Sequence, residues 1–262
     1  MNHSAITFKN VERLRRVSPA MAVAAANLVG RGRTFSVDAD GDWIHRQGST
    51  AFASPDVHAK RLSLIQEATR DEFLWRYTPK AEDIVFDVGA GVGEEAVALA
   101  PHVAHIYAIE AHPVTYRCLA KTISMSGLKN VTPIFCALSD ADGELRISTG
   151  ANHLANSIGD DGDIVPARSL ASLCAELGIS RVDFLKMNIE GAERLAVQGF
   201  GEVPIINMVI SCHDFVADTT GDEGFRTESE VLQFLNSHGY TVETRSDHER
   251  LWTRHMLYAR QH

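Results

Sequence analysis

The chain has 262 residues, of which 45% are hydrophobic and 23% are charged, and this composition excludes disordered, collagen-like and coiled-coil proteins. Lysine and arginine together number 25 against 34 aspartate and glutamate residues, so the formal net charge is −9. This acidic balance argues against nonspecific binding to nucleic acid or to an anionic membrane, because both require clustered basic side chains.

The first part of the chain carries no catalytic pattern. We expect residues 1–80 to form a mainly helical cap or extension in front of a domain that spans residues 81–262. Residues 10–29 are predicted to be helical with a break at Ser18–Pro19, and the apolar spacing over residues 57–77 predicts another helix. The alanine-rich run near the start is too short to cross a bilayer, which needs about 20 apolar residues, so no membrane span is expected. The N-terminal helices are a candidate homodimer interface.

The cysteine spacing bears on redox chemistry and on location. Cys118, Cys136, Cys174 and Cys212 are widely separated and include no C-x-x-C pair, which disfavours zinc and disulfide-exchange motifs. Reduced thiols of this kind are typical of a cytoplasmic protein.

From residue 83 onward, strands alternate with helices. Strands are predicted over residues 84–88, 105–110, 131–138, 182–189, 205–212, 241–244 and 256–260. Helices are predicted over residues 94–100, 114–126, 170–177, 192–198 and 228–238. Polar residues 140–163 predict a short hairpin and a loop. The alternation predicts an α/β fold with a mostly parallel sheet, whose ligands bind beyond the carboxyl ends of the strands.

A glycine turn follows the first strand of this domain. It reads Asp87-Val88-Gly89-Ala90-Gly91-Val92-Gly93-Glu94, whereas a dinucleotide fingerprint would place its third glycine at position 94. A glutamate at the start of the helix would repel a pyrophosphate but not a phosphate-free ligand such as S-adenosylmethionine. Glu110 ends the second strand 21 positions after Gly89, where an acidic side chain takes ribose hydroxyls of either cofactor.

Four segments carry a combined pattern: DIVFDVGAGVGEEAVALA, IYAIEAHPVTYRCLAKTI, KNVTPIFCALSDADGE and VDFLKMNIEGAE. The glycine turn, the A-L-S-D after the third strand and the L-K-x-x-x-E-G-A-E segment together resemble the FkbM-type methyltransferases. These are class I S-adenosylmethionine-dependent enzymes, and most of them methylate hydroxyl groups. The resemblance covers about residues 80–245 and leaves the first 80 residues outside.

The resemblance implies a Rossmann-like class I methyltransferase fold, with a seven-stranded, mostly parallel sheet and helices on both faces. It implies O-methylation of a hydroxyl group on a small molecule, such as a sugar or a natural product. Alternatives on the same fold are an N-methyltransferase and an enzyme that methylates a peptide or a lipid. A nicotinamide-dependent reductase is disfavoured by Glu94, and a binding module without catalysis is the remaining alternative.

The resemblance also implies the residues that contact S-adenosylmethionine. The residues implied are Asp87, Gly89, Ala90, Gly91 and Gly93 in the turn, Glu110, Ala111 and His112 after the second strand, Ala137 and Leu138 beside the adenine, and Asn188. Family members usually have aspartate at the position of Asn188, so the amide keeps the shape of that side chain and loses its charge.

Methyl transfer requires a positioned nucleophile and a group that removes its proton. The end of the fourth strand offers Lys186, Asn188 and Glu190, and the end of the fifth offers His213 and Asp214. His213 is the favoured base, because an ordinary imidazole has a pKa near 6.5.

The same strand ends allow a metal site, and a loop offers weak substrate contacts. Glu190, His213 and Asp214 are a candidate set of ligands for Mg, Mn or Zn, although a metal is not favoured because the spacing is not diagnostic. Asn156 and Ser157, in the polar loop, and Asp214 are weaker candidates for substrate binding.

Overall fold

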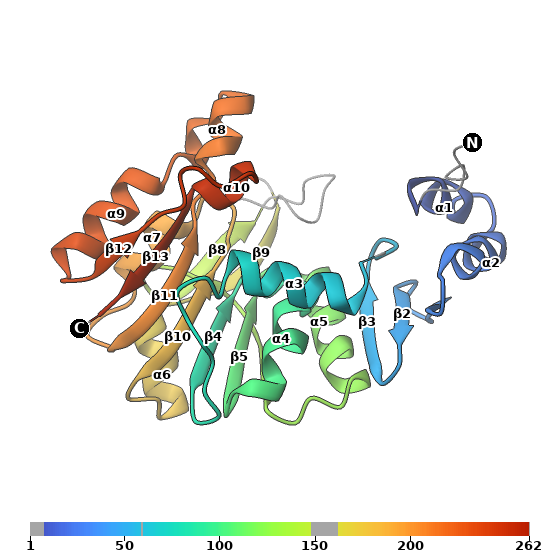
Figure 1. Ribbon diagram of the computed structural model, residues 1–262, viewed down its shortest axis with the longest axis horizontal. Coiled ribbons are helices and arrows are strands. Elements are labelled where there is room, and N and C mark those ends of the chain that lie inside the picture. Colours follow the sequence, from blue (N-terminus) through green and yellow to red (C-terminus); the bar gives the residue numbers. More distant parts are fainter. Residues whose placement is uncertain (1–7, 59, 148–161, 262) are drawn as a thin grey trace.

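The computed structural model describes residues 8–58, 60–147 and 162–261, and the candidate substrate residues Asn156 and Ser157 lie outside these ranges. A central sheet with helices on both sides forms the main body (Figure 1). The N-terminal helices α1 (Phe8–Arg15) and α2 (Pro19–Val29) lie at the far end of the long axis, beyond a small separate sheet (Figure 1).

The central sheet has seven strands. Their order is β12 (Thr241–Glu243), β13 (Met256–Arg260), β11 (Ile205–Ser211), β10 (Val182–Met187), β4 (Ile84–Val88), β5 (His105–Glu110) and β6 (Val131–Phe135). Strand β13 runs antiparallel to β11 and β12, while the pairs from β11 to β6 are parallel. This is the predicted Rossmann-like class I methyltransferase fold. The chain order reverses between β4 and β10, which is where such sheets leave a crevice at the strand ends.

Two layers of helices cover the sheet, because alternate residues of each buried strand point to opposite faces. Phe86 and Val88 of β4 pack in a cluster with α6 (Leu170–Leu177), α7 (Glu193–Gln198) and α9 (Glu228–Ser237). Val85, which precedes Phe86, packs on the other face with α4 (Glu94–Leu99) and α5 (Pro113–Met125). The remaining helices are α3 (Leu62–Glu72), α8 (Asp214–Thr220), α10 (Leu251–Arg254) and the short 3-10 turns η1 (Ala100–His102) and η2 (Glu223–Phe225).

The predicted strand over residues 131–138 is divided in two by Cys136. The second piece, β7 (Ala137–Leu138), leaves the central sheet and pairs with β9 (Asp163–Arg168), which also pairs with β8 (Gly143–Ile147). These three strands make a small second sheet. Through it, the end of the predicted strand over residues 131–138 lies at the crevice.

The N-terminal extension contains a sheet that the prediction of a mainly helical segment lacked. Strands β1 (Thr34–Val37), β2 (Trp43–Gln47) and β3 (Thr50–Ser54) form an antiparallel meander. The available signals were the glycine turns between these short apolar runs, which are typical of hairpins. The domain boundary at residue 80 and the homodimer interface stay predictions, the latter supported by the exposure of Met21 and Leu28 on α2.

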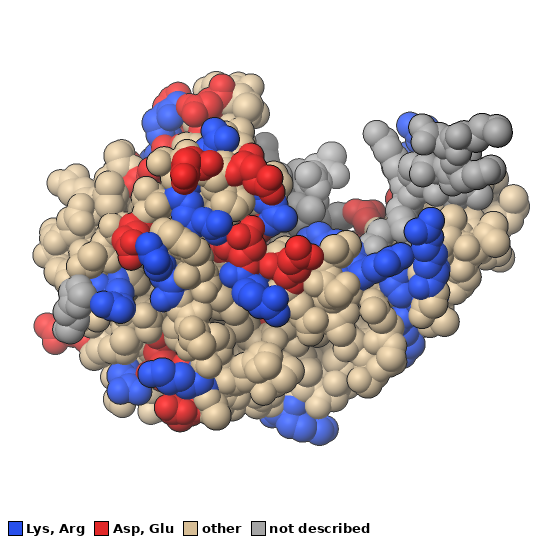
Figure 2. Space-filling view, in the orientation of Figure 1, with Lys and Arg blue, Asp and Glu red and all other residues tan. Residues whose placement is uncertain are grey.

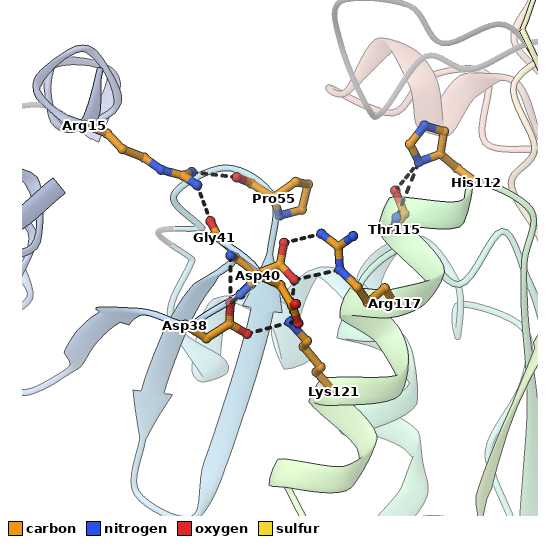
Figure 3. A network of polar contacts seen from close by, with 10 residues as sticks. Arg15, Asp38, Asp40, Gly41, Pro55, His112, Thr115, Arg117 and Lys121 are labelled. Carbon is orange, nitrogen blue, oxygen red and sulfur yellow. Dashed lines mark hydrogen bonds and ion pairs between the residues drawn. The ribbon is translucent and has the colours of Figure 1, made fainter. Parts of the chain in front are cut away.

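The extension is joined to α5 by polar contacts. The Ala51 N–H donates to Ser126 Oγ at 3.0 Å, and the Ala53 N–H donates to Thr122 Oγ1 at 3.0 Å. Arg117 and Lys121 of the same helix pair with the aspartates of the turn between β1 and β2, as Figure 3 shows.

On the face visible in Figure 2, basic and acidic side chains lie next to one another. Within the described ranges, no helix has the length and apolar character needed to cross a membrane.

Replacing Thr122 with valine tests the junction between β3 and α5. Thr122 is fully buried, so Thr122→Val keeps its shape but leaves the Ala53 N–H without its acceptor. We expect the free energy of unfolding to fall by about 1–3 kcal/mol in urea titrations. Ser124→Ala, at an exposed position of α5, is the control and should change stability little. If the two variants were equally stable, the hydrogen bond between Thr122 and Ala53 would not contribute to the stability of the protein.

Candidate active site

A cavity of about 460 Å³ opens at the carboxyl ends of β4, β5 and β10. Its walls come from the glycine turn, from the ends of β5 and β10, from β7, and from the segment of the extension between β3 and α3. The predicted cofactor residues that line it are Gly89, Ala90, Gly91, Glu110, Ala111, His112, Ala137, Leu138 and Asn188. Asp87 and Gly93 are absent from this lining, and Lys186 and Glu190 belong to it.

The glycine turn adopts a backbone that side chains would prevent. Gly89 has φ +71°, and a Cβ atom on it would lie 2.0 Å from the carbonyl oxygen of Asn188. The N–H groups of Gly89 and Ala90 donate to Ile109 O at 2.9 Å each, which ties the turn to the neighbouring strand. The close approach of the turn to the end of β10 therefore requires glycine at position 89.

Glu110 is fixed beside this turn. Its carboxylate accepts hydrogen bonds from the N–H groups of Gly91 at 2.9 Å and His112 at 2.8 Å. Burial raises the pKa of Glu110 to about 6, against the lowering effect of these two backbone donors. A carboxylate held in this way at the cavity wall is suited to accept hydrogen bonds from two ribose hydroxyls.

A buried ion pair lies under the turn. Asp87 is completely buried, and Lys186 Nζ lies 3.0 Å from its Oδ1 atom while donating to Gly89 O at 2.8 Å. Burial alone would lower the pKa of Lys186, but the charges of Asp87 and Glu95 raise it, so the ammonium stays protonated. A protonated Lys186 cannot take a proton from a substrate and instead holds the turn.

A buried acceptor in the cavity wall remains unused. Asn188 lines the cavity, and its Oδ1 atom has no hydrogen-bond partner among the described residues. An unsatisfied buried acceptor is costly unless a ligand completes it. This oxygen fits the ammonium group of S-adenosylmethionine, whereas Asp87 is not part of the lining and already pairs with Lys186.

Glu190 and His213 form a second polar group at the end of β10. Glu190 lines the cavity and has φ +53°, a left-handed conformation that costs about 1–2 kcal/mol for a residue with a side chain. His213 is buried and is not part of the lining; its Nε2 atom lies 3.3 Å from Glu190 Oε1 and its Nδ1 atom 2.9 Å from Glu193 Oε1.

The pKa of His213 differs from that of the ordinary imidazole that the sequence suggested. Burial alone would lower its pKa, but the hydrogen bonds and charges of Glu190 and Glu193 raise the pKa of His213 to about 10. At neutral pH the ring is an imidazolium and both nitrogens face carboxylates.

The candidate metal ligands do not converge. Both nitrogens of His213 are engaged by carboxylates, and Asp214 accepts from the N–H groups of Thr227 and Glu228 at 3.0 Å each. Among the described residues, the acidic and imidazole groups close enough to share an ion are Asp38, Asp40 and Asp42. There the ammonium of Lys121 lies within 2.5–2.7 Å of all three carboxylates, as Figure 3 shows for part of the group. The site therefore gives no support for a metal.

Several cavity residues were absent from the prediction. Glu95 of α4 lines the cavity, and burial raises its pKa. His58 and Lys60 come from the extension and both contact Glu94. The paired glutamates after the turn were a usable signal for Glu95, but no local pattern marked His58 or Lys60, because their contacts cross from another part of the chain.

The charge of His213 predicts a pH-dependent contribution to stability. Its pKa is about 10 in the folded protein, above the 6.5 of an ordinary imidazole, so folding favours the protonated ring. The stabilisation is complete below about pH 6.5 and is lost as the pH rises through about 10.

Urea unfolding of wild type and His213→Gln from pH 6 to pH 10 measures this contribution. We expect the difference in unfolding free energy to be largest at pH 6 and to shrink steadily toward pH 10. His102→Gln, at an exposed position, is the control. A difference that grows with pH would show that the ring is neutral in the folded protein.

The sequence of this chain matches a known protein family. Residues 87–242, more than half of the chain, match the family described as Methyltransferase FkbM domain. No curated protein matches the chain.

Solved structures with a similar arrangement are remote in sequence. The FkbM methyltransferase from Methylobacillus flagellatus KT is 18% identical over 71% of this chain and 45% of its own, with a TM-score of 0.48, so the chain spans less than half of that protein. TYW2 from M. jannaschii, solved with AdoMet, is 18% identical over 83% of each chain, with a TM-score of 0.45. SMU.1697c, a putative methyltransferase from Streptococcus mutans solved with SAH, is 12% identical over 79% of this chain and 100% of its own, also with a TM-score of 0.45. By the match over residues 87–242, the chain belongs to the FkbM family of S-adenosylmethionine-dependent methyltransferases.

Proposed function

We propose that this protein transfers the methyl group of S-adenosylmethionine to a hydroxyl group of a small molecule. The observation that carries the proposal is the cavity wall formed by the glycine turn and Glu110, inside the segment that matches the family. The cavity of about 460 Å³ has the size of a site for a cofactor and a small acceptor.

We assign the cofactor contacts from one end of the cavity to the other. Ala137 and Leu138 of β7 provide the apolar wall for adenine, and Glu110 accepts from the ribose hydroxyls. The free Oδ1 atom of Asn188 suits the ammonium group of the methionine moiety. The bound cofactor supplies an electrophilic methyl group on its sulfonium; the chain supplies the surfaces that hold it.

Glu190 is our candidate for the group that accepts the substrate proton. It lines the cavity, and the N–H groups of its neighbours Ile189 and Gly191 donate to Glu193 Oε1 at 3.3 Å each, which holds its strained backbone. His213 was favoured for this role from the sequence, but an imidazolium behind Glu190 has no lone pair to offer. We therefore give His213 a positioning role, and Lys186 the role of holding the turn.

Calorimetry tests the cofactor. We expect wild-type protein to bind S-adenosylhomocysteine with measurable heat and to give none with NADH, because Glu94 stands at the start of α4 where a pyrophosphate would lie. Heat with NADH alone would overturn the proposal and favour a reductase. Binding of S-adenosylhomocysteine without turnover on any acceptor would favour the binding module.

Glu190→Gln tests the proton acceptor. The acceptor is first found by mass spectrometry, as a metabolite that gains the label of trideuteromethyl S-adenosylmethionine; methylated nitrogen, peptide or lipid products would revise the substrate class. We expect Glu190→Gln to lower kcat by roughly 10²- to 10⁴-fold and to leave the Kd for S-adenosylhomocysteine within a few-fold.

The exposed Glu202→Gln is the matched control and should retain wild-type kcat. His213→Gln should lower kcat less than Glu190→Gln does, since it removes the positioning of the base and not the base. Full activity of Glu190→Gln would remove Glu190 from the mechanism.

A further inference from the structure

The segment between β3 and α3 forms one wall of the cofactor cavity although it lies outside the family match. Pro55, Val57, His58 and Lys60 line the cavity together with Gly91 of the glycine turn. The family match begins at residue 87, so these residues lie outside the segment that the family shares.

This segment is held in place from the N-terminal side. Arg15 Nη1 donates to Pro55 O at 2.8 Å, and the Val57 N–H donates to Glu12 Oε2 at 3.2 Å. Figure 3 shows Arg15 reaching from α1 to Pro55 and to Gly41 of the neighbouring turn. The segment is thus fixed over the cavity before any ligand arrives.

The far end of the segment contacts the first helix of the methyltransferase core. Lys60 Nζ donates to Glu94 Oε2 at 2.6 Å, and His58 Nε2 contacts the other oxygen of the same carboxylate. Burial would raise the pKa of Glu94, but the hydrogen bonds and charges of His58 and Lys60 lower it, so Glu94 is ionised.

Lys60 keeps capacity to bind a further anion. Its side chain is 60% exposed, and an ammonium group has three N–H donors, of which the contact with Glu94 uses one. Lys186, the other ammonium in the cavity wall, is 2% exposed and already pairs with Asp87 and donates to Gly89 O.

The orientation assigned to the cofactor brings its methionine end to this place. With adenine at Ala137 and Leu138 and ribose at Glu110, we place the methionine moiety beside the glycine turn, whose Gly91 lines the cavity together with Lys60. That moiety carries an ammonium and a carboxylate. The Oδ1 atom of Asn188 is available for the ammonium, and the carboxylate needs a cation with free donors.

We propose that Lys60 pairs with the carboxylate of the methionine moiety, so that the N-terminal extension completes the cofactor site. This inference rests on the proposed function. Cofactor affinity is then coupled to the docking of the extension, since the lysine reaches the cavity only while the segment is held there.

Lys60→Met tests the pairing, because methionine has a similar length and no charge. Calorimetry compares S-adenosylhomocysteine with its decarboxylated analogue, 5′-(3-aminopropylthio)adenosine, which keeps the adenosine and the ammonium. We expect Lys60→Met to weaken S-adenosylhomocysteine binding by roughly 10- to 100-fold and to leave the analogue within two-fold of wild type. Lys129→Met, an exposed lysine in the turn that follows α5, should change neither affinity.

A second variant separates direct pairing from neutralisation of Glu94. If Lys60 only neutralises that carboxylate, Lys60→Met combined with Glu94→Gln restores the affinity for S-adenosylhomocysteine, and the proposal is overturned. If Lys60 binds the ligand, the double variant stays weak.

Unchanged affinity in Lys60→Met, or equal loss for both ligands, would also overturn the proposal while leaving the proposed function intact. Wild-type protein that binds neither ligand would overturn the proposed function itself. Thermal melts of each variant without ligand confirm that the compared proteins are folded.

Discussion

The ion pair between Lys186 and Asp87 is the interaction on which the site depends. Removing two charges from water costs several kcal/mol per ion, and the pair offsets this cost only with good geometry and additional hydrogen bonds. Here the lysine also donates to the carbonyl of Gly89, and its ammonium lies 5.3 Å from the ring centre of Phe73. The central strands β4 and β10 are thereby joined at the point where the glycine turn begins.

A second buried group organises the other side of the strand ends. Glu193 is fully buried and contacts His213 at 2.9 Å and the hydroxyl of Thr227 at 3.1 Å. These residues come from α7, the end of β11 and the start of α9. A single carboxylate therefore fixes three elements relative to one another, and through His213 it orients Glu190 at the cavity. The strain in the backbone of Glu190 is sustained by this arrangement.

Local patterns were sufficient to predict the methyltransferase core. The apolar strands, the glycine turn and the position of Glu110 each depend on neighbours in sequence, and the structure brings Glu110 to the turn as expected. The charge of His213 could not be predicted in this way, because it is set by Glu190, which follows β10, and by Glu193, at the start of α7.

The structure of the N-terminal extension also could not be predicted from local sequence patterns. Its strands are short, and their stability comes from α5, whose residues follow them by about seventy positions. Lys60 reaches the cavity because Arg15 and Glu12 hold the segment before it. None of these contacts leaves a periodic trace in the sequence, since each joins residues that are distant along the chain.

The hydroxyls of Thr122 and Ser126 have a consequence beyond docking. Strand β3 is at the border of its sheet, and an uncovered border strand offers its amides to any extended polypeptide that meets it. A helix occupies those amides here, at Ala51 and Ala53. The hydrogen bonds that join the extension to α5 thus also prevent another polypeptide from pairing with β3. A chain that loses these hydrogen bonds exposes a strand edge on which aggregation can begin.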